Sequence, residues 1–152
     1  MTFNFCNYLN KKLIFYNYEG ITKKETILFL TKKLCQYYNL DYQRVLGNIL
    51  AREESLSSGI GGGIAVPHCR LMKINTVMVS VMVSKVPIDF DALDGKPVQL
   101  IFLFASPLDN SELYFQFLHF VTGFGNKELY EKVLKSSSPS EFLEIWSDVC
   151  KQ

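Results

Sequence analysis

The strongest candidate for chemistry in this sequence is His68, one of only two histidines, which follows a cluster of glycines. Residues 59–68 have the sequence GIGGGIAVPH and hold four of the nine glycines. Dense glycines permit backbone conformations that a Cβ forbids, and the run 64–66 predicts a short strand. Because Pro67 cannot donate to a strand ladder, we expect the strand to stop there, with His68 at its end on stiff backbone. An imidazole held in this way can act as an acid, a base, a metal ligand or a phosphoryl acceptor.

Plainer interpretations of this segment stay open at this point. A glycine-rich loop is often only a tight connection, and a single histidine is more often structural than reactive. Cys69 follows His68 and suggests a Cys–His nucleophile, but neighbours on extended backbone point to opposite sides, so a direct pair is not expected. The sequence has no GxxxxGK[ST] phosphate loop and no GxSxG elbow, which excludes those two kinds of site.

Length and composition predict one globular domain over residues 1–152. The chain is 48% hydrophobic and 20% charged, and its net charge is only +1, which favours neither nucleic acid nor an anionic membrane as the main partner. No apolar run approaches the roughly 20 residues that span a bilayer, so no membrane insertion is expected. With no secretory segment at its start, the chain is expected in the cytoplasm.

The four cysteines form no CxxC pair, and only two histidines accompany them. A zinc site is therefore not expected, and nothing in the sequence calls for another metal or a cofactor. In a cytoplasmic protein of this length we expect the four thiols to be reduced.

Local patterns predict the order strand, two helices, three strands, three helices. Thr22 and Glu25 form a capping box before a helix over 23–38, and Asp41 can cap a second helix that ends near 52–54. Strands are predicted at 13–18, 64–66, 77–83 and 98–105, with a loop over 69–74. The last three helices are predicted from about 111 to Gly123 and Gly125, over 126–134, and over 141–150. Together these elements predict an α/β fold with a mixed, five-stranded or similar sheet flanked by helices.

Three side chains could meet at one edge of that sheet: His68, Arg52 at the end of the second helix, and Glu112 at the start of the helix after the last strand. Such a site could transfer a phosphoryl group through a nucleophilic imidazole. Arg52 would neutralise the phosphoryl oxygens, although a cation at a helix C-terminus is also a simple dipole contact. Glu112 could hold the other ring nitrogen and set the tautomer.

Further donors to a phosphoryl group could come from the same segment of the chain. The backbone amides of Gly61, Gly62 and Gly63 and the hydroxyl of Ser57 or Ser58 are the candidates. The second histidine, His119, lies in an aromatic helix and is expected to be packed there rather than to bind a ligand.

The run REESLSSGIGGGIAVPH over residues 52–68 resembles the signature of the fructose/mannitol-type enzyme IIA domain of the bacterial phosphotransferase system. Nitrogen-regulatory IIA proteins share this signature, and the resemblance extends over nearly the whole chain. It implies that His68 is phosphorylated by the carrier protein HPr and dephosphorylated onto a IIB domain, and that Arg52 is the active-site arginine. Ser58 stands where the family usually has threonine, and Glu112 aligns with a second histidine. A carboxylate there would repel a phosphoryl dianion unless it were protonated or paired.

Three hypotheses follow from the resemblance. The first is a phosphocarrier that takes part in sugar transport with separate membrane partners. The second is a regulatory module of the nitrogen type that binds a target protein according to the phosphorylation of His68. The third is a degenerate IIA-like binding module that is no longer phosphorylated.

Overall fold

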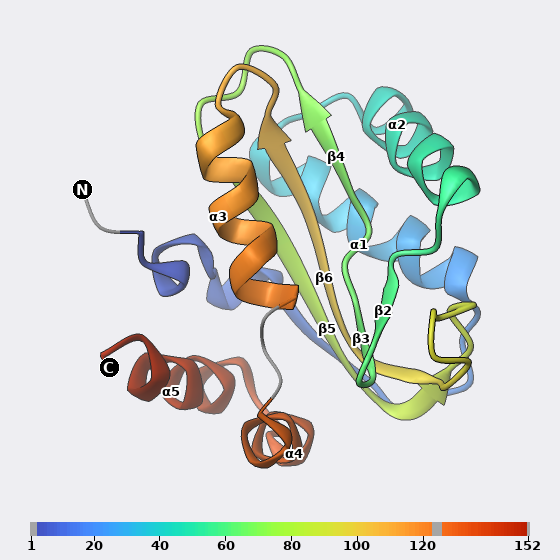
Figure 1. The fold of residues 1–152 in the computed structure, drawn as a ribbon, viewed down its shortest axis with the longest axis vertical. Coiled ribbons are helices and arrows are strands. Elements are labelled where there is room, and N and C mark those ends of the chain that lie inside the picture. Colours follow the sequence, from blue (N-terminus) through green and yellow to red (C-terminus); the bar gives the residue numbers. More distant parts are fainter. Residues whose placement is uncertain (1–2, 123–125, 152) are drawn as a thin grey trace.

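The computed structural model describes residues 3–122 and 126–151 (Figure 1). The helices are η1 (Phe5–Tyr8), η2 (Lys11–Leu13), α1 (Lys23–Tyr38), α2 (Tyr42–Ser55), α3 (Ser111–Thr122), α4 (Lys127–Lys135) and α5 (Pro139–Cys150). The strands are β1 (Ile14–Asn17), β2 (Gly59–Gly61), β3 (Ile64–Ala65), β4 (His68–Leu71), β5 (Met78–Ile88) and β6 (Val98–Pro107).

The strands form one mixed, six-stranded sheet in the order β1-β5-β6-β3-β2, and β4 also pairs with β6. The pairs β1/β5, β3/β6 and β4/β6 are parallel, whereas β5/β6 and β2/β3 are antiparallel. Figure 1 shows α1 and α2 on one side of the sheet and α3 on the other. The predicted fold class, a mixed sheet flanked by helices, is confirmed.

The central strand β6 divides the hydrophobic core in two. Its side chains alternate, so that Phe102 and Phe104 pack with α3 and α5, and Ile101 and Leu103 pack with α1 and α2. A strand that is apolar on both faces must be covered on both faces. The two helical layers follow directly from that requirement.

The segment between α2 and β5 differs from its prediction. Three strands were expected between the second and third helices, and five are present, because the glycines fold into the hairpin β2–β3 and the chain after Pro67 continues as β4. The predicted loop over 69–74 is therefore wrong for its first three residues. His68 is the first residue of a strand and does not lie at the end of one.

Pro67 interrupts the ladder without redirecting the chain. Ile64 pairs with Leu100 and His68 pairs with Phe104, so the register against β6 is the same before and after the proline. The carbonyl of Pro67 still accepts a hydrogen bond from the amide of Phe104, at 3.1 Å. Proline removes one donor from the ladder but leaves its carbonyl available. As a result, β4 continues β3 along the same side of β6, in the same register.

The helix signals in the sequence are largely confirmed. Thr22 and Glu25 make the capping box of α1, Asp41 caps α2 and Ser138 caps α5. The predicted end of the third helix at Gly123 and Gly125 lies outside the described residues. No helix within the described ranges is long and apolar enough to cross a membrane.

His119 is exposed, so the prediction that it is packed is wrong. Phe117 and Val121 face the core from α3. Residue 119 lies midway between them, about 200° around the helix from each, and its side chain therefore points away from the sheet.

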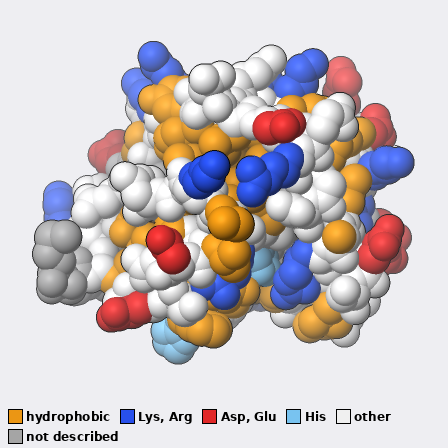
Figure 2. All heavy atoms as spheres, turned by 90° about the horizontal axis from the view of Figure 1, so that it is seen from above, with side chains coloured by type: hydrophobic (Ala, Val, Ile, Leu, Met, Phe, Trp, Pro, Cys, Tyr) orange, Lys and Arg blue, Asp and Glu red, His pale blue; other side chains and the backbone are white. Residues whose placement is uncertain are grey.

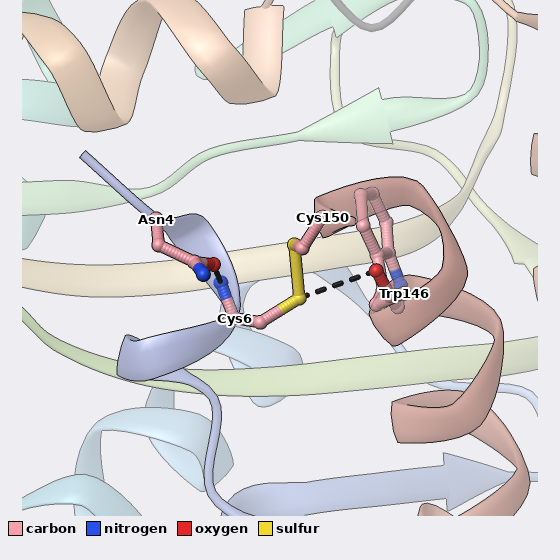
Figure 3. The surroundings of a disulfide bond; sticks show 4 residues. All are labelled: Asn4, Cys6, Trp146 and Cys150. Carbon is pink, nitrogen blue, oxygen red and sulfur yellow. Dashed lines mark hydrogen bonds between the residues drawn. A yellow bond between two sulfur atoms is a disulfide. The ribbon is translucent and has the colours of Figure 1, made fainter. Parts of the chain in front are cut away.

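Cys6 and Cys150 form a disulfide that joins η1 to the end of α5 (Figure 3), with their Cα atoms 6.4 Å apart. The prediction that all four thiols are reduced is wrong for this pair, which is separated by 144 residues. Sequence spacing could not identify it, because pairing depends on where the two ends of the chain meet. Cys35 and Cys69 are free and buried.

Candidate functional site

His68 lies on the face of β4 that packs against α3. Its ring stacks on Phe104, its partner in β6, with ring centroids 4.8 Å apart and an interplanar angle of 6°. Only 3% of the residue is exposed. Cys69, the next residue, belongs to the core on the opposite face, as expected for neighbours in a strand. Burial also raises the pKa of the Cys69 thiol to about 12, so it is not a nucleophile at neutral pH.

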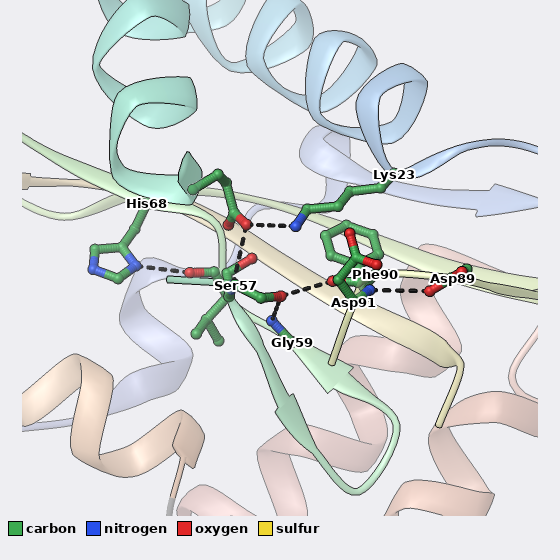
Figure 4. Close-up of polar contacts among 10 residues, drawn as sticks. Lys23, Ser57, Gly59, His68, Asp89, Phe90 and Asp91 are labelled. Carbon is green, nitrogen blue, oxygen red and sulfur yellow. Dashed lines mark hydrogen bonds and ion pairs between the residues drawn. The ribbon is translucent and has the colours of Figure 1, made fainter. Parts of the chain in front are cut away.

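The hydrogen bonds of His68 determine which of its ring nitrogens is reactive. Nδ1 lies 2.7 Å from the carbonyl oxygen of Val66, a contact drawn in Figure 4. A carbonyl oxygen only accepts hydrogen bonds, so Nδ1 carries the proton and donates it. Nε2 then holds the lone pair, and it accepts a hydrogen bond from the hydroxyl of Tyr114 at 3.0 Å. The nucleophilic atom of this imidazole is therefore Nε2.

His68 is held neutral. Burial lowers the pKa of the imidazole below its ordinary value of 6.5, and the positive charge of Arg52 lowers it further. The hydrogen bond to Val66 and the negative charge of Glu53 act in the opposite direction but are outweighed. A neutral imidazole attacks an electrophile through its unprotonated nitrogen, which here is Nε2.

Glu53 anchors the start of the glycine segment. One oxygen of its carboxylate, Oε2, pairs with Nζ of Lys23 at 2.9 Å and accepts a hydrogen bond from the amide of Ser58 at 3.1 Å. Ser57 adds a second anchor, because its hydroxyl donates to the carbonyl of Phe90 at 2.7 Å (Figure 4). These contacts tie the end of α2 to α1 and to the loop after β5.

Ser58 is linked to the histidine through the backbone of Val66. Its carbonyl accepts the amide of Val66 at 2.9 Å, and Val66 in turn holds Nδ1 of His68. Ser58 is 8% exposed, and its hydroxyl oxygen is buried with no hydrogen-bond partner among the described residues. A buried hydroxyl without a hydrogen-bond partner is available to donate a hydrogen bond to an oxygen of a ligand.

The three glycines assigned to phosphate binding lie elsewhere. Gly61, Gly62 and Gly63 all have positive φ angles, of 98°, 67° and 80°, and form the turn of the β2–β3 hairpin. The amide of Gly62 donates to the carboxylate of Asp94 at 3.1 Å. Four residues lie between Gly63 and His68, so an extended chain covers five residue steps from one to the other, a span of about 16 Å. The expectation that these amides face the imidazole is wrong, because the positive φ angles serve a tight turn at the far end of β3.

The predicted carboxylate partner of His68 is also placed differently. Glu112 is exposed in the first turn of α3, and no hydrogen bond or ion pair joins it to another side chain that the structure describes. Tyr114, two residues later, is the side chain from α3 that reaches Nε2. Residues two apart on a helix face different directions. The carbonyl of Val66, not a carboxylate, sets the tautomer.

Arg52 remains close enough to His68 for its charge to lower the pKa of the imidazole. It lies in the last turn of α2 and is exposed. The exposed guanidinium is thus available to an incoming anion. Arg52 also lies at the C-terminal end of α2, where a positive charge interacts favourably with the helix dipole. The interpretation of Arg52 as a dipole contact therefore stays open beside that of an anion-binding side chain.

Four residues around His68 were not predicted as site residues from the sequence: Val66, Glu53, Tyr114 and Arg70. Arg70 could have been found, because residues two apart in a strand point to the same face, but 69–74 was predicted to be a loop. Its guanidinium lies over the ring of Tyr114, with Cζ 4.7 Å from the ring centroid. No local pattern predicts the contact of Tyr114 with His68, because the two are 46 residues apart.

The side chains around His68 differ in kind from a set of metal ligands. The residues that the structure describes contain no group of three or more histidine, cysteine or acidic side chains that could hold a metal ion. The side chains near Nε2 instead offer a hydroxyl and the two guanidinium groups of Arg52 and Arg70. Hydroxyls and guanidinium groups stabilise negatively charged oxygens.

Comparison with known proteins identifies the family. Residues 7–149 match the family described as "Phosphoenolpyruvate-dependent sugar phosphotransferase system, EIIA 2". The chain is 36% identical to the nitrogen regulatory protein of Pseudomonas aeruginosa over 103 residues, which cover 68% of this chain and 67% of that protein. It is 32% identical to the nitrogen regulatory protein of Escherichia coli over 129 residues, 84% of this chain and 79% of the relative.

Solved structures agree with this assignment. Nitrogen regulatory protein IIA-Ntr from Neisseria meningitidis superposes with a TM-score of 0.85 at 29% identity, covering 93% of this chain and 97% of that chain. Enzyme IIAMtl of Escherichia coli, solved in complex with phosphorylated IIBMtl, gives a TM-score of 0.75 over 92% of this chain and 97% of that chain. At 18% identity this second likeness concerns the fold alone. Motif, family match and fold agree, and the chain belongs to the EIIA type 2 family of the phosphoenolpyruvate-dependent sugar phosphotransferase system.

Proposed function

We propose that this protein carries a phosphoryl group on Nε2 of His68, which it accepts from an HPr-like phosphocarrier. The observation that supports this most directly is the hydrogen bond from Nδ1 to the carbonyl of Val66, at 2.7 Å. It places the proton on Nδ1 and leaves the lone pair on Nε2, while burial keeps the ring neutral at pH 7. The imidazole is thus in its nucleophilic form before any partner arrives.

In the proposed transfer, the lone pair of Nε2 attacks phosphorus and forms a new N–P bond. The N–P bond of the donor histidine breaks, and its electron pair stays on the donor nitrogen. The ring of His68 gains positive charge because Nδ1 keeps its proton. The carbonyl of Val66 and the nearby carboxylate of Glu53 both favour that charge.

The negative oxygens of the phosphoryl group need partners in the transition state. Arg52 is exposed near the imidazole and supplies a cation. The unpartnered hydroxyl of Ser58 is the second candidate donor. Glu112 does not take part in this scheme, because Tyr114 occupies the position at Nε2.

A regulatory role is favoured over sugar transport. The relatives with the highest identities given above are both nitrogen regulatory proteins, and IIA-Ntr superposes more closely than IIAMtl. A phosphoryl group on His68 would add about two negative charges to this surface and change how it meets a target protein. Transfer to a IIB domain would use the same atom, so the two roles share one site.

Phosphoryl exchange with a phosphocarrier would take place in the cytoplasm. The Cys6–Cys150 disulfide is unusual for that compartment, where thiols are generally kept reduced. The bond joins the two ends of the described chain and does not include His68. The proposed transfer therefore does not depend on it.

The decisive experiment incubates the protein with enzyme I, HPr and labelled phosphoenolpyruvate. We expect acid-labile label on wild type and on His119→Ala, which removes the exposed histidine, and none on His68→Ala. Addition of IIB domains then separates the roles, because label that passes to a IIB domain indicates transport. Label retained with all IIB domains tested, together with phosphorylation-dependent binding of a target, indicates regulation.

The degenerate module is the second candidate, and one observation favours it. His68 is 3% exposed and its Nε2 is already hydrogen-bonded, so the imidazole is covered in this structure. Absence of label from wild type, with an authentic IIA protein labelled in parallel, would refute the carrier and support the degenerate module.

A further inference from the structure

Nε2 of His68 is covered by Tyr114. The tyrosine hydroxyl lies 3.0 Å from Nε2, and the two rings are 5.6 Å apart at 43°. An attacking nitrogen must approach its target along its lone pair, at roughly 3–3.5 Å in a reactive geometry. The hydroxyl of Tyr114 occupies that position. A phosphorus atom and the tyrosine oxygen cannot both lie on the lone pair of Nε2.

Tyr114 is in turn held by Arg70. The guanidinium of Arg70 lies over the tyrosine ring, with Cζ 4.7 Å from the ring centroid. Its Nη2 donates to the carbonyl of Leu108 at 3.1 Å and to the hydroxyl of Ser111 at 2.9 Å. Leu108 lies in the connection from β6 to α3, and Ser111 is the first residue of α3. Arg70 thus ties the start of α3 to β4, two residues after His68 and on the same face of the strand.

The covering side chain lies at the edge of the core, next to the surface. Tyr114 is only partly buried, and its neighbour Phe115 is 60% exposed. Figure 2 shows this end of the molecule from above, with Lys and Arg side chains beside a band of hydrophobic ones. Rotation of Tyr114 about χ1 would carry the ring from Nε2 towards that surface, with loss of its contacts to Phe104 and the edge of the core.

We propose that Tyr114 is a gate on Nε2 of His68, closed by its hydroxyl bond to Nε2 and by Arg70 against its ring. The biological purpose of this gate rests on the proposed function. The gate itself concerns the reactivity of Nε2 towards any electrophile. When Tyr114 turns away, the lone pair of Nε2 and one face of the Arg70 guanidinium are exposed together. Nε of Arg70 is buried and has no partner among the described residues, so it keeps a donor for a phosphoryl oxygen.

The gate is tested with diethylpyrocarbonate, a small electrophile that needs no partner protein. The lone pair of a neutral imidazole nitrogen attacks a carbonyl carbon of the reagent, an N–C bond forms, the anhydride C–O bond breaks and ethyl carbonate leaves. The other ring nitrogen then gives up its proton to the solvent. The chain has only two histidines, so the exposed His119 is an internal reference for reagent concentration and pH. Mass spectrometry of the digested protein gives the two rates separately.

We expect His68 in wild type to react much more slowly than His119. In Tyr114→Phe, which keeps the ring and removes the hydroxyl, His68 should react about 2- to 10-fold faster, the change expected for loss of one neutral hydrogen bond. Tyr114→Ala should raise the rate further. Arg70→Met, which loses the cation over the ring and both hydrogen bonds, should change the rate in the same direction.

The matched control is Tyr16→Phe, which removes a hydroxyl that bonds Ser136 and the carbonyl of Ser138, far from His68 in the sheet. It should leave the rate of His68 unchanged. The buried thiol of Cys69, on the opposite face of β4, reports any general loosening, because it becomes reactive only when that core opens.

Equal rates at the two histidines of wild type would overturn the gate. So would a rate at His68 that Tyr114→Phe and Tyr114→Ala leave unchanged, or a rise that is matched by exposure of Cys69. Labelling of the same variants by HPr tests the proposed function separately. A faster reaction with diethylpyrocarbonate and no label from HPr would support the gate and refute the phosphoryl carrier.

Discussion

Neutralisation of His68 by burial should be measurable as a pH dependence of stability. The folded protein keeps the pKa of His68 below 6.5, whereas the unfolded chain protonates this residue at its ordinary value of 6.5. Below pH 6.5 the unfolded state therefore binds more protons than the folded state. The free energy of unfolding must fall as the pH falls from 6.5 towards the pKa of the folded state.

The size of this effect has an upper limit. One proton bound only by the unfolded state changes the free energy of unfolding by at most about 1.4 kcal/mol for each pH unit. Little screening by solvent is expected, because His68 is 3% exposed. Carboxylates also titrate at low pH, so the contribution of His68 is the difference between wild type and His68→Gln, which carries no titratable ring.

The assay is urea unfolding at pH 7.5, 6.5 and 5.5, followed by the fluorescence of Trp146, the only tryptophan, which is 1% exposed. We expect wild type to lose up to about 1 kcal/mol more than His68→Gln between pH 6.5 and 5.5, because the unfolded histidine is already half protonated at pH 6.5. His119→Gln should parallel wild type, because His119 is exposed. If wild type and His68→Gln lose stability in parallel over this range, His68 is not held neutral by the fold and the argument for a nucleophilic Nε2 fails.

Three further predictions concern the rest of the fold. Cys150→Ser, or reduction of its bond to Cys6, should lower the free energy of unfolding by at most about 5 kcal/mol, the chain-entropy value for this separation of 144 residues; urea midpoints that do not depend on reductant would contradict it. Gly63→Ala should destabilise the protein by roughly 2 kcal/mol, because φ is +80° and Tyr130 fills the place of a Cβ. The penalty measured in urea should be smaller in a Tyr130→Phe background, and an equal penalty there would show that the hydroxyl is not the obstacle. Burial raises the pKa of Cys69 to about 12, so this thiol should not react with a disulfide reagent at pH 8 until urea unfolds the protein, and rapid reaction of the native state would refute that.

Local chemistry determined much of this fold in advance. The capping box of Thr22 and Glu25 predicted the start of α1, because the hydrogen bonds that cap a helix join residues three apart in sequence. The apolar run of β6 predicted a central strand with helices on both faces, because each face has to be buried. The spacing from Arg52 to His68 predicted the family, since that spacing lies within one continuous segment.

Local patterns gave wrong predictions where the role of a residue depended on a neighbouring part of the fold. Pro67 predicted the end of a strand, yet the chain resumes as β4 because the neighbouring β6 continues and Pro67 still offers its carbonyl. The glycines predicted an anion site, but their positive φ angles serve a hairpin whose turn lies away from His68.

The sequence by itself thus determined the family and identified His68 as the candidate for its chemistry. Only the tertiary structure decided how that residue is controlled. The carbonyl of Val66 accepts the proton of Nδ1 and leaves the lone pair on Nε2, which accepts a hydrogen bond from Tyr114, 46 residues along the chain. The disulfide between Cys6 and Cys150 is likewise a contact that only the tertiary structure decided. Such contacts join residues whose separation in sequence carries no periodic signal, so they are set by the packing of α3 and α5 against the sheet.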